Sequence, residues 1–158
     1  MNDHKDLPLR LGVGIILLNS KNKDFVGKRI DNPQNFWQMP QGGIDVNENF
    51  LEAAKRELEE ETGIKNIKII KEFDKWLEYD LPKNLLGKIW KGKYRGQKQK
   101  WFIMKFLGKN EEINIKTKNP EFSEWKWIDP KNLPNVAVNF KVSIYTIIMK
   151  ELDSLNQS

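Results

Sequence analysis

The chain has 158 residues, which is the length of one domain and enough to bury a hydrophobic core. Its 27 Lys and Arg exceed its 22 Asp and Glu, so the formal net charge is +5 and anionic partners are favoured. The chain has no cysteine and one histidine, His4, which excludes disulfides, cysteine or two-histidine metal sites and a serine-histidine triad. Any bound metal would be held by oxygen, and hydrolysis would depend on carboxylates.

Hydropathy and the N-terminal residues bear on localisation. The longest apolar run, residues 11–18, is too short to span a membrane, and the opening residues MNDHKDLPLR lack the apolar stretch of a signal peptide. No spare apolar stripe is evident that a second copy could cover. We expect one domain over residues 1–158, with no membrane partner, in a cytoplasmic protein that is a monomer.

Two strands and a packed loop are predicted first along the chain. Residues 10–18 are rich in branched apolar side chains, which predicts a buried strand central to a sheet. A polar turn separates them from residues 25–29, so a hairpin is expected. Residues 31–43 form a loop that contains Phe36 and Trp37, side chains that favour burial, so this loop should be packed down.

The next element is a helix over residues 50–62. Asn49 can cap its N-terminus, with Glu52 three residues later completing a capping box. Gly63 suits the position just after the helix, where the backbone is left-handed. The boundaries of this helix are therefore set by local chemistry.

Three carboxylates of this helix, Glu57, Glu60 and Glu61, follow the spacing i, i+3, i+4 and share one face. Like charges at this spacing repel each other by a few tenths of a kcal/mol per pair. A divalent cation is the simplest group that would relieve the repulsion. The helix is therefore predicted to hold a metal ion.

The second half of the chain is predicted to alternate strands with a final helix. Strands are expected at residues 67–72, 73–81, 98–107, 111–116 and 124–128, and an amphipathic helix at residues 140–155. Strands and helices mixed in this way predict an α/β fold, in which a mixed β-sheet is sandwiched between α-helices.

Residues 81–110 contain nine Lys or Arg and no acidic residue. Such a block indicates a polyanionic partner, and the interleaved Trp90, Tyr94 and Trp101 favour nucleic acid. The alternative is a solvated basic face with no partner.

A sequence signature lies across the helix. Nine positions match every specified residue of the Nudix box, GX5EX7REUXEEXGU, in which U is aliphatic: Gly42, Glu48, Arg56, Glu57, Leu58, Glu60, Glu61, Gly63 and Ile64. The chain thus resembles the Nudix hydrolases, whose fold is a mixed sheet between helices. Their activity is hydrolysis of a nucleoside diphosphate linked to another group, usually with magnesium.

The resemblance implies roles for individual residues. Glu57, Glu60 and Glu61 would be catalytic and bind Mg²⁺, with Mn²⁺ or another divalent cation as a substitute. Glu121 and Gly42 would complete the metal site, although Glu121 could instead be a solvated loop acid. The remaining box residues Glu48, Arg56 and Gly63 would be structural, with Glu48 and Arg56 forming an ion pair that braces the loop against the helix.

Outside the box, the strings WQMPQGG (residues 37–43) and GQKQKWF (residues 96–102) resemble the bacterial RNA pyrophosphohydrolase subfamily. The resemblance implies conversion of an RNA 5′-triphosphate or 5′-diphosphate end to a monophosphate, which promotes mRNA decay. Arg29, Val138 and Phe140 would hold a base of the RNA, and Arg10, Lys98 and Lys141 would contact its phosphates. From position alone, Phe140 could equally be a core residue.

Three other activities remain open at this point. The first is hydrolysis of diadenosine polyphosphates (Ap4A or Ap5A), which would use the same glutamates. A nucleotide-sanitising pyrophosphatase is disfavoured by the long basic surface. A catalytically silent RNA-binding protein is disfavoured by the intact box.

Overall fold

The computed structural model describes residues 6–31 and 34–156, so His4 and Pro33 lie outside the described residues. The strands are β1 (Leu9–Leu18), β2 (Asp24–Arg29), β3 (Gln41–Gly43), β4 (Ile67–Glu72), β5 (Leu77–Asp80), β6 (Gly96–Phe106) and β7 (Phe122–Ile128). The α-helices are α1 (Phe50–Thr62), α2 (Leu133–Val136) and α3 (Val142–Asn156).

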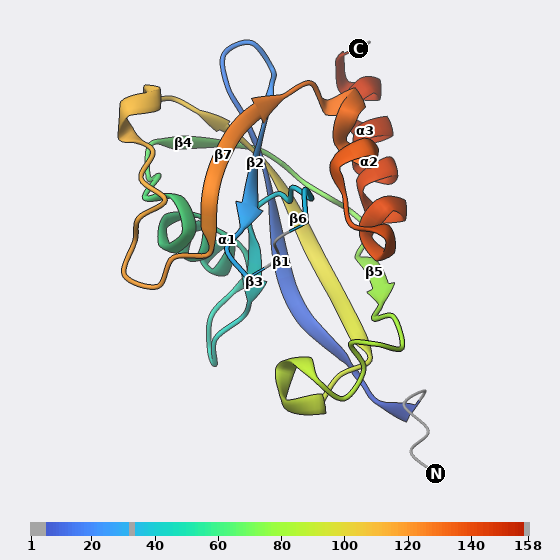
Figure 1. The fold of residues 1–158 in the computed structure, drawn as a ribbon. Helices are drawn as coiled ribbons and strands as arrows, with labels where there is room; N and C mark the ends of the chain where they lie inside the picture. The colour runs from blue at the N-terminus through green and yellow to red at the C-terminus, as the bar shows by residue number, and fades with distance from the viewer. Residues whose placement is uncertain (1–5, 32–33, 157–158) are drawn as a thin grey trace.

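The strands form one mixed sheet in the order β4-β6-β1-β2-β7, with β3 paired to β1 and β5 paired to β6 (Figure 1). The long central pairing of β1 with β6 is parallel and runs from Leu9 opposite Gly96 to Leu18 opposite Lys105. The other strand pairs are antiparallel. The short β3 therefore lies beside β1, where Gly42 is opposite Val13.

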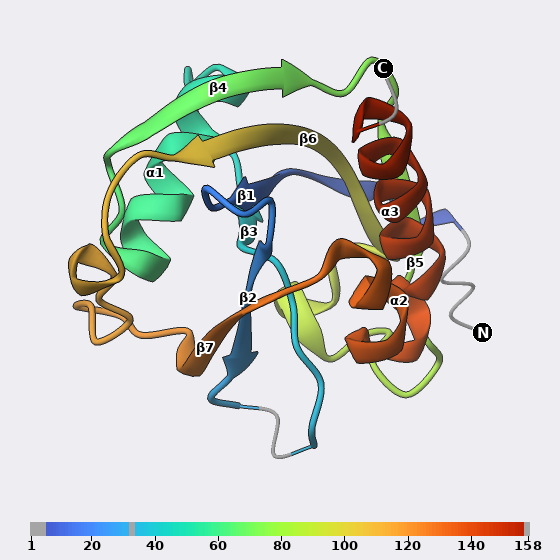
Figure 2. The ribbon, with the colours of Figure 1, turned by 90° about the horizontal axis from the view of Figure 1, so that it is seen from above.

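Helices cover both faces of the sheet, α1 on one side and α2 with α3 on the other (Figure 2). Because successive strand residues point to opposite faces, Ile15 of β1 packs in the core on the α1 side and Ile16 in the core on the α3 side. Ala54 and Leu58 of α1 join the first core, and Ile148 of α3 joins the second. The predicted α/β fold, a mixed sheet between helices, is confirmed.

Local signals set the ends of α1 as predicted. The Asn49 side-chain oxygen accepts a hydrogen bond from the Glu52 N–H at 2.8 Å, and Gly63 has φ of 71°. The strand predicted at residues 67–72 is also confirmed. The helix predicted at residues 140–155 begins at Val142, because residues 139–141 form a 3₁₀ turn before it.

The strand predicted at residues 111–116 is wrong. Residues 110–112 form a 3₁₀ turn, and Ile113 and Ile115 are half-buried beside the α1 core. The Asn114 N–H donates to the Thr62 carbonyl at the end of α1, at 2.8 Å. The alternating pattern thus reflects a loop packed on α1. In the predicted strand 73–81, only Leu77–Asp80 is extended in the sheet.

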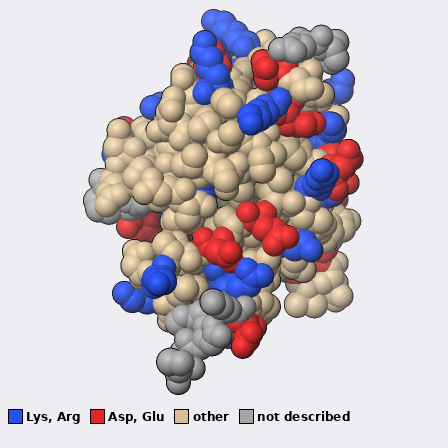
Figure 3. Space-filling model, turned by 90° about the vertical axis from the view of Figure 1, so that its right-hand side faces the viewer, with Lys and Arg blue, Asp and Glu red and all other residues tan. Residues whose placement is uncertain are grey.

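Helix hydropathy and the distribution of surface charge bear on which partners the molecule can meet. Within residues 6–31 and 34–156, no helix is long and apolar enough to cross a membrane. On the side formed by α2 and α3, basic and acidic side chains are interspersed around a continuous uncharged area (Figure 3). That side carries no track of a single charge sign.

Candidate active site

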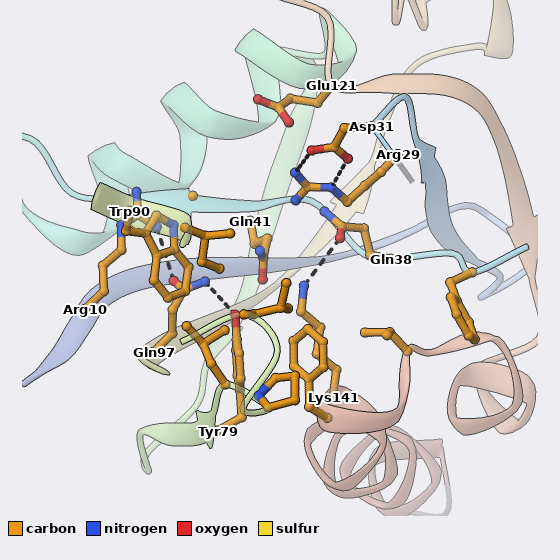
Figure 4. Close-up of a pocket in the computed structure, with 18 of the residues that line it drawn as sticks. Arg10, Arg29, Asp31, Gln38, Gln41, Tyr79, Trp90, Gln97, Glu121 and Lys141 are labelled. Atoms are coloured by element: carbon orange, nitrogen blue, oxygen red, sulfur yellow. Dashed lines mark hydrogen bonds and ion pairs between the residues drawn. The ribbon is translucent and has the colours of Figure 1, made fainter. Parts of the chain in front are cut away.

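A cavity of about 980 Å³ lies between α1, β3, the residues before α3 and the loop that precedes β6 (Figure 4). The structure brings ten of the predicted site residues to its wall: Arg10, Arg29, Gly42, Glu57, Glu60, Glu61, Glu121, Val138, Phe140 and Lys141. Carboxylates of α1 thus share one cavity with basic and aromatic side chains from distant parts of the chain.

Lys98 does not line the cavity, although the resemblance implied that it contacts substrate. Along β6, Gln97 and Gln99 are buried, and Lys98 between them points to the opposite face of the sheet. Its ammonium lies 5.3 Å from the ring centre of Trp76. We therefore leave Lys98 out of the candidate site.

The acidic side of the cavity is formed by α1 lying against β3. The Gln41 N–H donates to Glu61 at 3.3 Å, and Gly42 lies against the Glu57 carboxyl group. Glu61 is almost completely buried, with 4% of its surface exposed, whereas the Glu60 side chain is 57% exposed. The three box carboxylates therefore differ strongly in their contact with water.

Arg56 connects this acidic side to the loop before α1. Its Nε and Nη2 donate to the Glu48 carboxylate at 2.7 and 2.9 Å, and Nη2 also donates to the Gly43 carbonyl at 3.0 Å. Its Nη1 donates to Glu57 at 2.9 Å and to Glu60 at 3.1 Å. The Glu48–Arg56 pair thus spans loop and helix, and the same guanidinium holds two of the box carboxylates.

Burial and mutual repulsion shift the acid equilibria here. Burial, followed by repulsion from Glu57 and Glu121, holds the pKa of Glu61 well above its ordinary value. Burial also raises the pKa of Glu57, although the Arg56 guanidinium opposes the shift. In each case the ionised form is disfavoured, so a nearby positive charge would be strongly favourable.

These donors suit a hard divalent cation, because they are carboxylate oxygens crowded in a poorly hydrated place. Among the residues that the structure describes, no three Asp, Glu, His or Cys side chains already converge as a metal-binding group. Glu57 and Glu60 share the Arg56 Nη1 instead. The exposed Glu121 lines the same cavity and is close enough to influence Glu61.

Across the cavity, Arg10 is held by uncharged groups. Its Nη1 donates to the Gln97 side chain at 3.3 Å, and its guanidinium lies 5.3 Å from the ring centre of Trp90. A side chain at Gly43 would overlap the guanidinium, so this glycine leaves the room that Arg10 occupies. Arg10 is therefore held in position without an ion pair to any residue that the structure describes.

A buried polar network supports Arg10. Gln97 donates to the Tyr79 hydroxyl at 2.7 Å, and Gln99 donates to Gln41 at 2.8 Å. Burial raises the pKa of Tyr79 to about 12, so its hydroxyl stays protonated at neutral pH. The floor of the cavity is thus neutral and hydrogen-bonded, which fixes side-chain positions without competing for an anion.

Lys141 is the buried cation of the cavity. Its ammonium donates to Gln38 at 3.3 Å and lies 5.7 Å from the ring centre of Tyr79. Burial, aided by repulsion from Arg29, lowers the pKa of Lys141 to about 7. Phe140, half-buried, packs on Tyr79 with 5.5 Å between ring centres and also faces the cavity.

Sequence reasoning gave no individual role to five residues of this wall, Asp31, Gln38, Gln41, Tyr79 and Gln97, and it counted Trp90 only among the aromatics that favour nucleic acid. Gln38, Gln41 and Gln97 lie within the strings that carried the subfamily resemblance, so those strings contained a signal. Trp90 lies in the basic segment and has a left-handed backbone, with φ of 52°. Nothing local in the sequence predicts that its ring reaches Arg10.

A mixed sheet between helices, with helix carboxylates facing basic side chains across one cavity, is the architecture of a Nudix-type hydrolase. The NUDIX domain model matches residues 8–146, and the chain belongs to that family. Members of the family generally use divalent cations. The match includes α1 and β6 and ends within α3.

Individual relatives extend this result. The chain is 62% identical over 156 residues to the RNA pyrophosphohydrolase of Pelagibacter ubique (strain HTCC1062), covering 98% of this chain and 99% of the relative. It is 50% identical over 154 residues to the RNA pyrophosphohydrolase of Rickettsia canadensis (strain McKiel), covering 98% and 96%. The E. coli dihydroneopterin triphosphate pyrophosphohydrolase shares the fold, with a TM-score of 0.69 at 18% identity, covering 89% of this chain and 94% of that one.

Proposed function

We propose that this protein hydrolyses the 5′-triphosphate or 5′-diphosphate end of RNA to a 5′-monophosphate, releasing pyrophosphate or phosphate and promoting mRNA decay. The observation that carries the proposal is that one cavity presents the α1 carboxylates opposite Arg10, Lys141 and the ring of Phe140. The two bacterial relatives named RNA pyrophosphohydrolase support it, because they match nearly the full chain.

Glu57, Glu60, Glu61 and Glu121, with Gly42, would hold Mg²⁺, for which Mn²⁺ or another divalent cation could substitute. A bound divalent ion neutralises polyphosphate charge and acidifies a coordinated water. One of the box glutamates would also orient or deprotonate the attacking water. Glu48, Arg56 and Gly63 would act structurally, through the ion pair and the end of α1.

The basic side of the cavity would bind the substrate. Arg10, fixed by Gln97 and Trp90 and without an ion pair among the described residues, would present its guanidinium to the phosphates. Lys141 would add a second donor, since a phosphate beside its ammonium favours the charged form. Phe140 offers one face of its ring for stacking a base, and Val138 and Arg29 lie along the same wall.

The proposal is tested by incubating 5′-triphosphorylated RNA with the protein and Mg²⁺ and identifying the released product. We expect a 5′-monophosphorylated RNA together with pyrophosphate or phosphate. Diadenosine tetraphosphate, which contains the same type of anhydride bond, is the competing substrate. If kcat/KM for RNA is about a hundredfold lower than for diadenosine tetraphosphate, the RNA assignment is wrong.

A matched pair of variants separates catalysis from folding. Glu57→Gln should abolish turnover and leave RNA binding largely intact, because a neutral amide is a poor metal ligand. Glu59→Gln changes a neighbouring glutamate that pairs with Lys65 outside the cavity, so it should keep normal turnover. Full turnover by Glu57→Gln would contradict the metal assignment.

We further propose that residues 1–158 act as a single Nudix domain and as a monomer, in the cytoplasm where transcripts are present. Large exposed apolar side chains among the described residues come from separate elements, including Leu11 in β1, Ile70 in β4 and Ile147 in α3. Size-exclusion chromatography with light scattering measures the oligomeric state directly.

A further inference from the structure

Two arginines face the cavity in different electrostatic states. Among the described residues the Arg10 guanidinium forms no ion pair: it donates to the Gln97 amide, lies beside the Trp90 ring and is close enough to Glu57 to favour that carboxylate's charged form. The Arg29 guanidinium instead meets a carboxylate, that of Asp31, two residues further along the chain (Figure 4). Within the part of the chain that the structure describes, one guanidinium of the cavity therefore forms no ion pair and the other forms one.

The Arg29–Asp31 contact is bidentate. Arg29 Nε donates to one Asp31 oxygen at 2.8 Å, and Nη2 donates to the other at 2.6 Å. Paired hydrogen bonds of this kind fix the guanidinium plane as well as its distance. The contact occupies one edge of the guanidinium, and Nη1 donates no hydrogen bond to the residues that the structure describes, so its N–H groups can serve a ligand.

The backbone around this pair is also fixed. A shift of strand register falls between Lys28 and Arg29, where β2 leaves its regular pairing with β7. The Ile30 N–H then donates to the Glu121 carbonyl at 2.9 Å. Arg29 and Asp31 flank this anchored residue, and both side chains line the cavity.

Without Asp31, other carboxylates would attract Arg29. Glu121 and Glu61, two of the proposed metal ligands, lie near enough to act on the charge of Arg29. An arginine drawn to either one would leave its place on the wall and compete with a cation. Asp31 provides a nearer partner, so Arg29 stays away from the acidic side.

We propose that Asp31 is a positioning and specificity-determining residue, which holds Arg29 as a charge-neutral hydrogen-bonding group that reads the edge of an RNA base. This inference rests on the proposed function. A neutralised guanidinium attracts phosphate weakly but still donates hydrogen bonds, and the stacking face of Phe140 lies in the same cavity. Arg10, which forms no ion pair with the residues that the structure describes, is left to bind phosphates.

The chemistry also indicates which base this arrangement suits. Two donors of an arginine match two neighbouring acceptors, and O6 and N7 of guanine form such a pair. A correctly placed contact of this type discriminates between bases by roughly tenfold or more in affinity. Discrimination therefore depends on the orientation of Arg29, which the Asp31 carboxylate sets.

The test measures kcat/KM on 5′-triphosphorylated RNAs that differ only in the identity of the first or second base. The wild-type protein should favour guanine at one of these positions by roughly tenfold. Asp31→Asn should lose most of this preference for guanine, mainly because KM rises on the favoured RNA. Its melting temperature should be unchanged. Asp31→Glu, which restores a carboxylate, should recover part of the ratio.

Two controls exclude indirect effects. Asp80→Asn removes the partner of Arg95 in another ion pair, outside the cavity, and should leave the base ratio unchanged. In a double-mutant cycle, Arg29→Lys should add little loss of discrimination once Asp31 is Asn, because the two side chains act as a unit.

The outcomes distinguish the two proposals. Retention of the wild-type base ratio by Asp31→Asn, or a wild-type protein that shows no base preference, would overturn the role of Asp31 and leave the RNA activity standing. A wild-type protein that cleaves diadenosine tetraphosphate and leaves every triphosphorylated RNA intact would overturn the proposed function and the inference together.

Discussion

Gly42 in β3 lies directly against the side-chain carboxyl group of Glu57 in α1, and a methyl group on Gly42 would overlap it. The close approach follows from β3 pairing with β1 beneath the helix. The position of the Glu57 side chain thus depends on the absence of a side chain at Gly42. The neighbouring Gly43 leaves room in the same way for Arg10.

Gly42→Ala should therefore displace Glu57 and lower kcat by about 100-fold, the usual effect of misplacing a reacting group by about 1 Å. Circular dichroism should show a folded protein. Gly108→Ala is the matched control, because its new methyl group would also meet a carboxylate, that of Glu112 outside the cavity. Normal kcat in Gly42→Ala would show that Glu57 does not need its observed position.

Glu61→Gln should lower activity and raise stability. Loss of a proposed metal ligand should reduce kcat by about 100-fold or more. Because burial and repulsion raise the pKa of Glu61, its stabilising contribution is lost as pH rises, so ionised Glu61 destabilises the metal-free fold at neutral pH. The melting temperature of metal-free Glu61→Gln should exceed that of the wild type, increasingly so at higher pH.

The exposed Glu59 provides the control for that experiment, since Glu59→Gln changes the same residue type on the same helix. It should alter neither kcat nor the pH dependence of melting. A Glu61→Gln protein that melts below the wild type at about pH 8 would contradict the electrostatic argument.

Arg56→Lys should destabilise the fold by about 1–2 kcal/mol. A lysine ammonium cannot reach both the Glu48 carboxylate and the Gly43 carbonyl, which the guanidinium contacts together. Urea unfolding measures the change. Arg95→Lys, in the more exposed pair with Asp80, should cost less than about 1 kcal/mol, and an equal loss in both variants would contradict a bracing role for Arg56.

Asp24→Asn should stabilise the protein increasingly as pH rises, with normal activity. Asp24 is fully buried at the start of β2, and its carboxylate oxygens have no hydrogen-bond partner among the described residues. The Phe25 and Leu17 backbones lie near enough to favour the charged form slightly, but burial dominates and raises the pKa well above its ordinary value.

A carboxyl group with a raised pKa in the folded state contributes stability at low pH and loses it as pH rises through that pKa. The difference in melting temperature between Asp24→Asn and the wild type should therefore grow from about pH 4 to about pH 8. A difference that stays constant over this range would show that Asp24 does not titrate as its burial requires.

Local parts of this structure were predictable from sequence because their causes are local. Asn49 caps α1 through a neighbour three residues away, and Gly63 ends the helix through its own backbone. The Nudix box placed the glutamates on one helix face. The alternation of polar and apolar residues at 111–116 led to a wrong strand prediction, because Ile113 and Ile115 belong to a loop that packs on the α1 side.

The side of the cavity that contains Arg10 and Arg29 was harder to predict from the sequence. β6 is buried on both faces over most of its length, so its pattern does not reveal that Gln97 faces the cavity and Lys98 faces away. Asp31 is an ordinary loop acid by sequence, and its pairing with Arg29 depends on how β2 ends. Trp90 reaches Arg10 only through the path of a long loop.

The parallel pairing of β1 with β6 has a consequence for how the protein forms. It joins residues as far apart as Arg10 and Gln97, which are 87 positions apart, and contacts at such separation form slowly. During synthesis the apolar side chains of β1 stay unpaired and exposed until β6 has been made, and exposed apolar strands are prone to aggregation. The cavity, whose floor includes this pairing and whose wall includes Phe140 and Lys141, therefore cannot form on the ribosome until residue 141 has emerged.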